Sequence, residues 1–512
     1  MGRKNNRGNS IPRAVFVGLS LALQIGWLLI RIVKLNEYSA VISVLTGFLA
    51  LAVVLRLYSD STTTSAMKMP WILLIALFPV MGLSLYLMME VFGDTGKRGK
   101  QFSAIQQELR KFFQQKEEVL QEIWQRDPAV GGQCRYLWEK TDAPVYENTA
   151  VQYFGDAADA FDALKREAEK AESFIFLEYF IVQEGSAWQE LQQILARKAK
   201  QGVEVRLMYD DIGSIGCVNL AFMKQMNGLG IRCKVFNPAL PFLNLFMNHR
   251  DHRKIAVFDG KIAFAGGFNL SDEYFGRSFP YGKWKDTGIR LEGEAVRSMT
   301  AEFLEMWNMG ERNNDAYGKY LTTQHSMPEA TGFVQPYADD PLGKERTAEN
   351  VYLNLISSAH ETLWLMTPYL IISDEMNRAL GLAAKRGVDV RIITPGIPDK
   401  KAVYAVTRSY YGALAANGVR IFEWKPGFCH AKQCLCDRRA ASIGTSNLDY
   451  RSLYHHFENN VLLYDCDAVE QMAEDFENTF TKCREMTPLY QGGRNSALFL
   501  WQCVLRLFAP LL

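Results

Sequence analysis

Two stretches of the sequence carry the same set of reactive side chains, in the same order and at the same spacing. They are NHRDHRKIAVFDGKIAFAGGFN, from Asn248, and CHAKQCLCDRRAASIGTSN, from Cys429. The interval from histidine to asparagine is 17 residues in each, counted from 252 to 269 and from 430 to 447. The first set is His252, Lys254, Asp259 and Asn269, and the second set is His430, Lys432, Asp437 and Asn447.

Such a set suits chemistry on a phosphate diester. A strand with histidine and lysine two positions apart projects both side chains from one face. If the two stretches meet, two lysines and two asparagines hold the non-bridging oxygens and stabilise charge in the transition state. One imidazole attacks phosphorus, while the other protonates the leaving alcohol and then deprotonates the incoming one. Asp259 and Asp437 end each strand before a turn and are interpreted as the scaffold of the two catalytic motifs.

Three cysteines beside the second histidine, Cys429, Cys434 and Cys436, raise the alternative of a zinc site. The matching positions of the first stretch hold aspartate, alanine and phenylalanine. The groups that both stretches share therefore need no metal, and we expect neither a catalytic metal ion nor another cofactor. The other alternative, a solvated strand face, is typical of one histidine–lysine pair but not of two pairs at identical spacing.

The two stretches lie in a longer internal repeat. SFIFLEYF at Ser173 matches TLWLMTPYL at Thr362, KAKQGVEVRLM at Lys198 matches AAKRGVDVRII at Ala383, and GIRCKVFNP at Gly230 matches GVRIFEWKP at Gly418. Helix-like segments that end in glycine and lead into β-branched runs predict alternating helices and strands around a sheet. We therefore predict two similar α/β units, 151–330 and 331–490, packed as a pseudo-dimer that brings the two stretches together.

Three apolar runs without a formal charge, 14–30, 38–55 and 70–89, precede the repeat. Runs of 17 to 20 residues are long enough to cross a membrane as helices, so residues 1–92 are predicted to be a membrane-anchoring segment with two or three transmembrane helices. Three buried core helices are the alternative. Basic residues on both sides of the three runs place both flanks in the cytoplasm by the positive-inside rule, which three crossings cannot satisfy. One run is then expected to lie in the interface or to enter and return, and the weak points are Pro79 in the third run and the short connection 31–37 after the first.

The segments around the repeat complete this organisation. Residues 93–150 are polar, with apolar positions at helical spacing, which predicts a helical connector. Residues 491–512 are apolar on most faces, and we expect a helix that either lies in the membrane interface or packs on the second unit. These features predict a multi-pass protein of the cell membrane with a cytoplasmic catalytic part.

The charge balance bears on the kind of partner, and the cysteine content bears on the cellular compartment. The 512 residues include 57 basic and 56 acidic side chains. This balance lacks the basic excess of a nucleic-acid binder, so no nucleic-acid partner is expected. Nine cysteines without regular spacing do not indicate a disulfide framework and fit a reducing compartment. The oligomeric state cannot be read from the sequence.

The two motifs, HxKxxxxD with an asparagine ten residues later, resemble the signature of the phospholipase D superfamily, in which two copies form one active site. The apolar N-terminal runs, NLDYRSLYHHFENN after the second motif and the ending RLFAPLL resemble bacterial cardiolipin synthases over almost the whole chain. This resemblance implies that one phosphatidylglycerol donates its phosphatidyl group to a second through a phosphohistidine intermediate. Phosphatidylglycerol and cardiolipin in the membrane are then the partners, and glycerol is released.

The resemblance also implies roles for individual residues. His252 attacks phosphorus, and His430 protonates the departing glycerol. Members of the superfamily orient each histidine with a carboxylate, and the candidates are Asp286 and Glu458, which follow the histidine of their own motif by 34 and 28 residues. A surface carboxylate is the alternative for each of them.

The two motifs differ at one position, where Gly267 stands in the first and Thr445 in the second. Because a hydroxyl donor is missing from the first half, we expect backbone NH groups to replace it. His249, His455 and His456 have no matching copies and are expected to be structural or surface residues. Three functions stay open: cardiolipin synthesis, another reaction of the same superfamily such as phosphodiester hydrolysis or a different phosphatidyl transfer, and a membrane scaffold with an inactive site.

Overall fold

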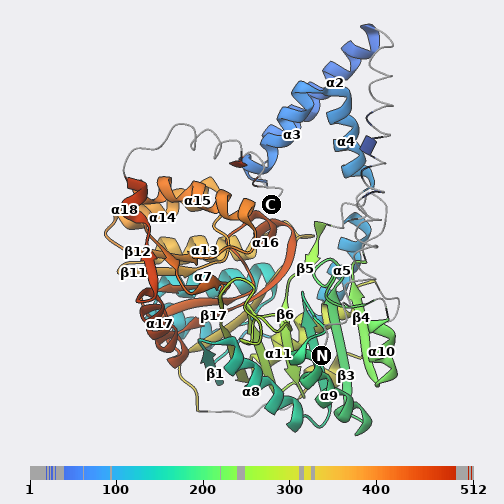
Figure 1. Cartoon of the computed structure of the whole chain (residues 1–512), viewed down its shortest axis with the longest axis vertical. Helices are drawn as coiled ribbons and strands as arrows, with labels where there is room; N and C mark the ends of the chain where they lie inside the picture. The colour runs from blue at the N-terminus through green and yellow to red at the C-terminus, as the bar shows by residue number, and fades with distance from the viewer. Residues whose placement is uncertain are drawn as a thin grey trace.

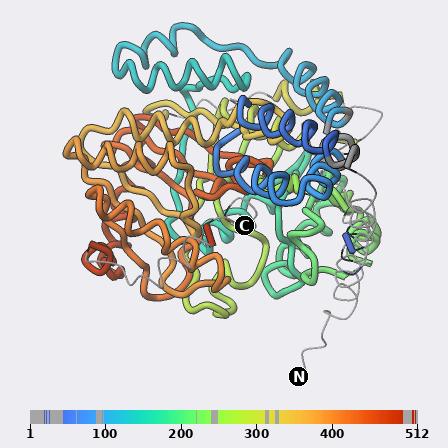
Figure 2. Tube along the Cα trace, turned by 90° about the horizontal axis from the view of Figure 1, so that it is seen from above, coloured from blue at the N-terminus to red at the C-terminus, as the bar shows by residue number. Residues whose placement is uncertain are grey.

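The structure is a computed structural model of the 512-residue chain. It describes residues 40–60, 63–92, 95–219, 221–238, 248–310, 316–323 and 329–491, and the single positions 19, 22, 25, 26, 29, 505, 506 and 509. Two α/β units lie side by side, and a group of N-terminal helices projects from them (Figure 1; Figure 2).

The first unit is built on a seven-stranded sheet with the order β1-β9-β7-β6-β2-β3-β4. β2, β3 and β4 run parallel, whereas β6, β7, β9 and β1 continue the sheet in antiparallel pairs. The strands are β1 (Thr149–Phe154), β2 (Phe174–Tyr179), β3 (Glu204–Asp210), β4 (Ile231–Phe236), β6 (Lys254–Phe258), β7 (Ile262–Gly266) and β9 (Gly288–Gly293). The helices are α8 (Ala157–Lys170), α9 (Ser186–Lys200), α10 (Phe222–Gly228), α11 (Val296–Asn308) and α12 (Gly318–Leu321).

The second unit has the sheet order β10-β17-β16-β15-β11-β12-β13-β18. Its strands are β10 (Phe333–Asp339), β11 (Thr362–Met366), β12 (Asp389–Pro395), β13 (Arg420–Trp424), β15 (Gln433–Cys436), β16 (Ala440–Gly444), β17 (His456–Tyr464) and β18 (Cys483–Glu485). Its helices are α13 (Thr347–Ser358), α14 (Asp374–Lys385), α15 (Lys401–Ala416), α16 (Tyr450–Tyr454), α17 (Asp467–Phe480) and α18 (Thr487–Gln491). Apart from the added edge strand β18, this order repeats that of the first sheet, so the predicted pair of similar α/β units is confirmed.

The repeated sequence explains the repeated turns from helix to strand. α9 and α14 are each followed by a glycine, Gly202 or Gly387, with φ angles of 92° and 100°. Residues with a Cβ atom rarely adopt this left-handed conformation, so glycine ends each helix and turns the chain towards the sheet. β3 and β12 follow, and both are mostly buried between layers of helices.

The two units share a core and exchange short strands. One apolar cluster contains Phe176 and Phe303 of the first unit and Phe457 and Phe476 of the second. Two parallel strand pairs cross between the units: β5 (Arg250–Asp251) pairs with the start of β17, and β14 (Gly427–Cys429) pairs with β8 (Lys283–Lys285). Each unit therefore places the segment before its histidine against a strand of the other unit, as a pseudo-twofold arrangement requires.

The N-terminal part differs from its prediction. It forms α2 (Ala40–Ser59), α3 (Ser65–Leu77) and α4 (Pro79–Phe92), which project from the two units (Figure 1). The run 70–89, predicted to be one transmembrane helix, is divided at Phe78, because Pro79 has no NH group to continue α3 and begins a new helix. α4 packs closely on α3, since a Cβ atom at Gly82 would lie 2.7 Å from the Cα atom of Ile75.

Within the part of the chain that the structure describes, no helix is both long enough and apolar enough to cross a membrane. The two or three transmembrane helices in 1–92 stay a prediction: α2 carries most of the second run in one helix, whereas the third run consists of two short helices. The first run, 14–30, lies almost wholly outside the described residues.

The predicted connector is helical and touches both units. It contains α5 (Thr95–Arg110), α6 (Glu117–Arg126) and α7 (Pro128–Thr141). α5 contacts α11 of the first unit, and α7 contacts α13 of the second. Most of 491–512 lies outside the described residues. At its described positions, Arg506 donates hydrogen bonds to Ser409 on α15, and Ala509 is buried, which agrees with packing on the second unit.

Candidate active site

The exchanged strands position the two histidines. The backbone NH of His252 donates to the carbonyl oxygen of Phe457 at 2.9 Å, and that of His430 donates to the carbonyl oxygen of Lys285 at 2.7 Å. Both contacts continue the register of the parallel pairs, in which Asp251 faces Phe457 and Cys429 faces Lys285. The residue that follows each acceptor is therefore held beside the histidine of the other unit.

That following residue is the predicted carboxylate, but the pairing crosses between the units. Nδ1 of His252 lies 2.9 Å from both carboxylate oxygens of Glu458, and Nδ1 of His430 lies 2.6 Å from Oδ2 of Asp286. The sequence named both carboxylates as candidates by their distance from the histidine of their own motif, without stating which histidine each one orients. The pairing crosses because of the strand exchange, which places each histidine against the sheet of the other unit.

The contact with the carboxylate of Glu458 sets the tautomer of the His252 ring. An imidazole whose Nδ1–H donates to a carboxylate has its lone pair on Nε2, which is the nitrogen left for chemistry. Burial lowers the pKa of His252 to about 3 and that of His430 well below its ordinary value. Both rings are therefore neutral in the free protein at neutral pH, as a nucleophilic imidazole must be.

The two carboxylates have opposite pKa shifts. Burial alone would raise the pKa of Glu458, but the contacts with His252 and His456 outweigh it and hold that pKa below its ordinary value. Burial raises the pKa of Asp286 to about 7, against the lowering effect of Lys432. The His252 half-site thus holds an ionised carboxylate, whereas the His430 half-site retains a proton more readily.

Lys254 and Lys432 are buried beside their histidines. The ammonium of Lys254 donates to the backbone carbonyl oxygen of His252 at 2.6 Å. That of Lys432 donates to the carbonyl oxygen of His430 and lies 2.7 Å from its Nδ1. The charge of Lys254 also acts on Lys432 and on His430, across the boundary between the units. The two half-sites therefore form one site.

Burial lowers the pKa of Lys254 to about 7 and that of Lys432 to about 8. In the free protein both lysines lose their protons as the pH rises through this range, and an anionic diester binds best when both are charged. We expect kcat/KM for an anionic diester to fall about tenfold or more from pH 7 to pH 9. Initial rates at low substrate over this range measure the fall. Lys254→Arg serves as the control, because its charge persists, and a flat wild-type profile would contradict the expectation.

Asp259 and Asp437 make one and the same set of contacts in the two units. Each carboxylate accepts three backbone NH groups at the entry to a central strand, from residues 172–174 for Asp259 and from residues 360–362 for Asp437. Both aspartates have a left-handed φ, 55° and 51°. Each aspartate links the turn after β6 or β15 to the start of the neighbouring strand, β2 or β11. These contacts agree with the scaffold interpretation.

The two asparagines differ in their contacts. Oδ1 of Asn269 accepts the NH of Ile181 at 3.0 Å, and its amide nitrogen donates to the hydroxyl of Tyr274 at 2.8 Å. Oδ1 of Asn447 is buried and, among the described residues, has no hydrogen-bond partner. Asn447 is thus the better placed of the two to accept a new contact from a ligand.

The difference between Gly267 and Thr445 has a steric cause. A Cβ atom at Gly267 would lie 2.1 Å from Oδ1 of Asp286, so only glycine leaves room for that carboxylate. The same oxygen accepts the backbone NH of Thr287 at 2.9 Å. In the other half, the hydroxyl of Thr445 donates to Glu458. In the first half, a backbone NH therefore donates to the carboxylate, whereas a hydroxyl does so in the second half.

Aromatic side chains around the histidines were missed by the sequence reasoning. The ring of Phe180 meets that of His252 edge-on at 4.9 Å, and Tyr274 meets His430 in the same way at 5.3 Å. They exclude water from the imidazoles and so contribute to the lowered pKa values. Neither residue belongs to the repeated motif. The signal in the sequence is their position, because Phe180 directly follows the strand β2 and Tyr274 comes five residues after Asn269.

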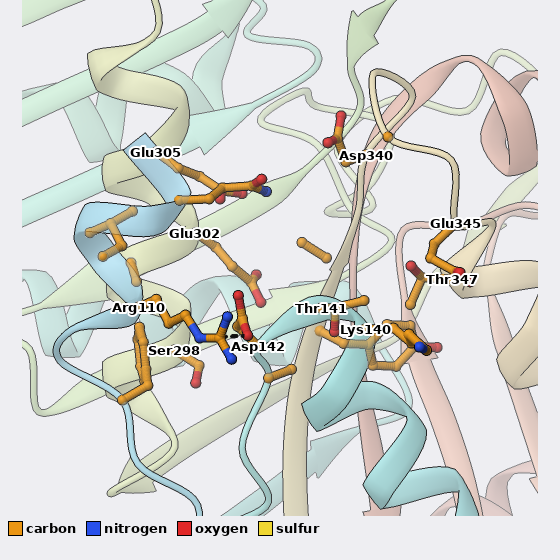
Figure 3. A pocket seen from close by; sticks show the side chains of 18 of the residues that line it. Arg110, Lys140, Thr141, Asp142, Ser298, Glu302, Glu305, Asp340, Glu345 and Thr347 are labelled. Atoms are coloured by element: carbon orange, nitrogen blue, oxygen red, sulfur yellow. Dashed lines mark ion pairs between the residues drawn. The ribbon is translucent and has the colours of Figure 1, made fainter. Parts of the chain in front are cut away.

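A cavity of about 250 Å³ lies away from the two histidines, among α5, α7, α11 and β10 (Figure 3). Its carboxylates include Glu302, Glu305 and Asp340. Arg253, between His252 and Lys254 in the sequence, pairs with Glu305 at 2.6 Å.

The cysteines of the second stretch do not form a metal site. Cys429, Cys434 and Cys436 are free and buried, and burial raises the pKa of each thiol. Among the described residues, the one group of three ligands within reach of a single ion is His252, His456 and Glu458. The zinc alternative drawn from the cysteines is therefore not supported.

Two histidine–lysine pairs in one site between two similar α/β units define a phospholipase D-like protein. Comparison with protein families agrees. The family described as cardiolipin synthase, PLD-like domain, matches residues 164–307 and 352–480, more than half of the chain, and the phospholipase D-nuclease N-terminal family matches residues 47–89. The chain belongs to the PLD-like cardiolipin synthase family.

Individual relatives cover most of the chain. A cardiolipin synthase of Alkalihalophilus pseudofirmus is 33% identical over 86% of this chain and 88% of its own length, and one of Geobacillus kaustophilus is 32% identical over 97% and 98%. A Streptococcus mutans protein without a stated function is 41% identical over 86% of this chain and 96% of its own length. The crystal structure of a Haemophilus influenzae phosphatidylserine synthase matches 75% of this chain with a TM-score of 0.55, and its 15% identity supports the fold alone.

Proposed function

We propose that the protein is a cardiolipin synthase, which transfers a phosphatidyl group from one phosphatidylglycerol to another and releases glycerol. The observation that carries the proposal is a single buried site with two neutral imidazoles, each held at Nδ1 by a carboxylate from the other unit. A double displacement on a phosphate diester needs a nucleophile and an acid of this kind. Relatives named cardiolipin synthase over nearly the full chain support the choice of substrate.

In the first step, Nε2 of His252 attacks phosphorus, and the bond from phosphorus to the glycerol oxygen breaks. The proton that Asp286 and His430 share passes through Nε2 of His430 to that oxygen, which leaves Asp286 ionised and the ring neutral, with its proton on Nδ1 and its lone pair on Nε2. In the second step, His430 takes the proton from a hydroxyl of the second phosphatidylglycerol, whose oxygen attacks phosphorus and frees His252. Lys254, Lys432 and the two asparagines hold the non-bridging oxygens, and the phosphate charge keeps both lysines protonated.

The electrostatic difference between the halves supports this assignment of roles. The ionised carboxylate of Glu458 accepts Nδ1–H of His252 and stabilises the positive charge that the ring acquires when it attacks. The raised pKa of Asp286, about 7, keeps a proton in the His430 half-site near neutral pH. A proton held there is available to the leaving alcohol.

We also propose that α2, α3 and α4 hold the enzyme at a membrane. These helices expose many large apolar side chains: Val44, Leu45, Phe48, Leu49, Leu51, Leu55, Met69, Leu73, Leu77, Phe78 and Leu87. A patch of this extent on a projecting element is typical of a membrane or partner contact. The basic residues after α4 (Lys97, Arg98 and Lys100) favour the cytoplasmic side for the catalytic units.

The product test uses one lipid. Purified protein given phosphatidylglycerol alone is expected to form cardiolipin and free glycerol in equal amounts, because both the donor and the acceptor are then present. Mass spectrometry of the lipids and an enzymatic glycerol assay measure the two products, with a His252→Ala preparation as the control. Phosphatidic acid as the sole lipid product would move the protein to the hydrolases.

A further inference from the structure

His456 is a buried histidine that the proposed reaction does not use. Its side chain lies in the active site, where its ring centre is 5.5 Å from that of His252. It is only 8% exposed, and neither ring nitrogen has a hydrogen-bond partner among the described residues. Nδ1 is 3.7 Å from Oε1 of Glu458, which is too far for a hydrogen bond. Buried polar atoms are usually paired, so an unpaired imidazole here points to a ligand that pairs it.

The other half of the site offers a matched comparison. His456 and Trp284 occupy equivalent places, each two residues before the carboxylate that holds a histidine. The ring of Trp284 lies 5.4 Å from that of His430 at an angle of 47°, and the ring of His456 lies 5.5 Å from that of His252 at 45°. Tryptophan offers no lone pair to a metal ion. The fold therefore accepts either an imidazole or an indole ring two residues before the carboxylate. Only the half-site of His252 has an additional metal-binding side chain there.

We propose that His252, His456 and Glu458 form a binding site for a zinc-like divalent cation, and that this cation inhibits the enzyme. One ligand atom from each of the three lies within 4.8 Å of the other two. Oε1 of Glu458 is 2.9 Å from Nδ1 of His252 and 3.7 Å from Nδ1 of His456. These distances lie on either side of about 3.3 Å, the edge of a tetrahedron whose metal–ligand bonds are about 2.0–2.1 Å.

The donor set selects the class of ion. Two imidazoles and one carboxylate suit Zn²⁺, Co²⁺ or Ni²⁺, whereas Mg²⁺ and Ca²⁺ prefer sites made of oxygen ligands. Lys254 is the nearby positive charge that opposes a cation. We therefore expect reversible binding that a chelator removes, and no permanently bound ion.

Inhibition follows from the tautomer of His252. The attacking ring carries its proton on Nδ1 and its lone pair on Nε2. An ion on Nδ1 needs the lone pair there, so the proton moves to Nε2 and blocks attack. An ion on Nε2 occupies the attacking atom directly. In both cases the ion also binds the carboxylate of Glu458, which then no longer stabilises the positive charge on the His252 ring. Inhibition rests on the proposed function, whereas metal binding does not.

The test combines binding with activity on the full-length protein. Titration of metal-free protein with Co²⁺ is expected to give the strong visible absorption of a tetrahedral site at one ion per chain. His456→Trp, which copies the residue of the other half, and His456→Ala are both expected to weaken binding tenfold or more. Zn²⁺ should lower the rate of cardiolipin formation in the wild type at least tenfold, and EDTA should restore the rate. Mg²⁺ should not inhibit the enzyme.

In both His456 variants, the inhibitory Zn²⁺ concentration, measured against the variant's own rate without metal, should rise by at least tenfold. Equal Co²⁺ absorption in the wild type and the variants would overturn the site, whatever the enzyme activity. Tetrahedral binding that depends on His456 without any effect of Zn²⁺ on the rate would retain the site and overturn the inhibition. Trp284→His is the converse variant, and a second Co²⁺ ion per chain is expected from it.

Discussion

Replacing His252 with alanine is expected to lower the rate of cardiolipin formation by on the order of 10⁴-fold or more and to abolish any covalent phosphatidyl adduct. The reason is that Nε2 of His252 forms the bond to phosphorus in the proposed first step. His430→Ala should lower the rate with phosphatidylglycerol by a similar factor. It should nevertheless form the adduct from a diester with a nitrophenolate leaving group, which needs no proton.

Rapid quench with a denaturant followed by peptide mass spectrometry locates the adduct. Alkaline conditions after the quench preserve a phosphohistidine, and the wild type with phosphatidylglycerol is the reference. An adduct on His430 in the wild type would reverse the two roles and keep the two-histidine mechanism. Absence of an adduct in every variant and with every leaving group would contradict the covalent pathway.

Replacing Glu458 or Asp286 with its amide is expected to have the second-largest effect on the rate. These variants test whether each carboxylate serves the histidine of the other unit. In Glu458→Gln, the amide NH₂ can donate to Nδ1 of His252, which moves the ring proton to Nε2. A substitution of this kind in a catalytic triad costs about 10⁴-fold in rate, and we expect about 10³–10⁴-fold here. Because the damaged ring is the nucleophile, the loss should persist with the nitrophenyl diester.

Asp286→Asn should behave differently, although Asp286 belongs to the same unit as His252. Its partner is His430, so adduct formation, which is slowed with phosphatidylglycerol, should be largely recovered with the nitrophenyl diester. The two variants are matched controls for each other, and their thermal unfolding should be compared with that of the wild type. If Asp286→Asn blocked adduct formation and Glu458→Gln did not, each carboxylate would serve the histidine of its own motif.

The family and the fold class could be predicted because their signals are local and repeated. Two identical intervals of 17 residues and three matched segments in the same order are improbable without a duplicated unit. The shared order of strands in the two sheets then follows, because each copy has the same alternation of helices and strands. The resemblance to the superfamily also named the two carboxylates as candidates, 34 and 28 residues after the histidines of their motifs.

Pro79 marked the run 70–89 as a weak point, but the formation of two helices there was not predicted, because hydropathy measures composition over a window and not continuity of the backbone. Pro79 was visible in the sequence, but whether a proline bends a helix or ends it depends on what packs around it. Here α4 packs on α3 at Gly82, and the chain folds back. The apolar side chains are those expected, but the helices that carry them are shorter.

What the sequence determined by itself is the chemical inventory: two imidazoles, two ammonium groups, two carboxylates and the repeat that places them in equivalent positions. Only the tertiary structure decided which carboxylate serves which histidine, why glycine stands at 267, and that His456 joins His252 and Glu458. The physical reason is that the pairing of β5 with β17 and of β14 with β8 crosses between the units. Hydrogen bonds between strands distant in the chain leave no periodicity in the sequence, so the partner of each histidine became apparent only in the folded protein.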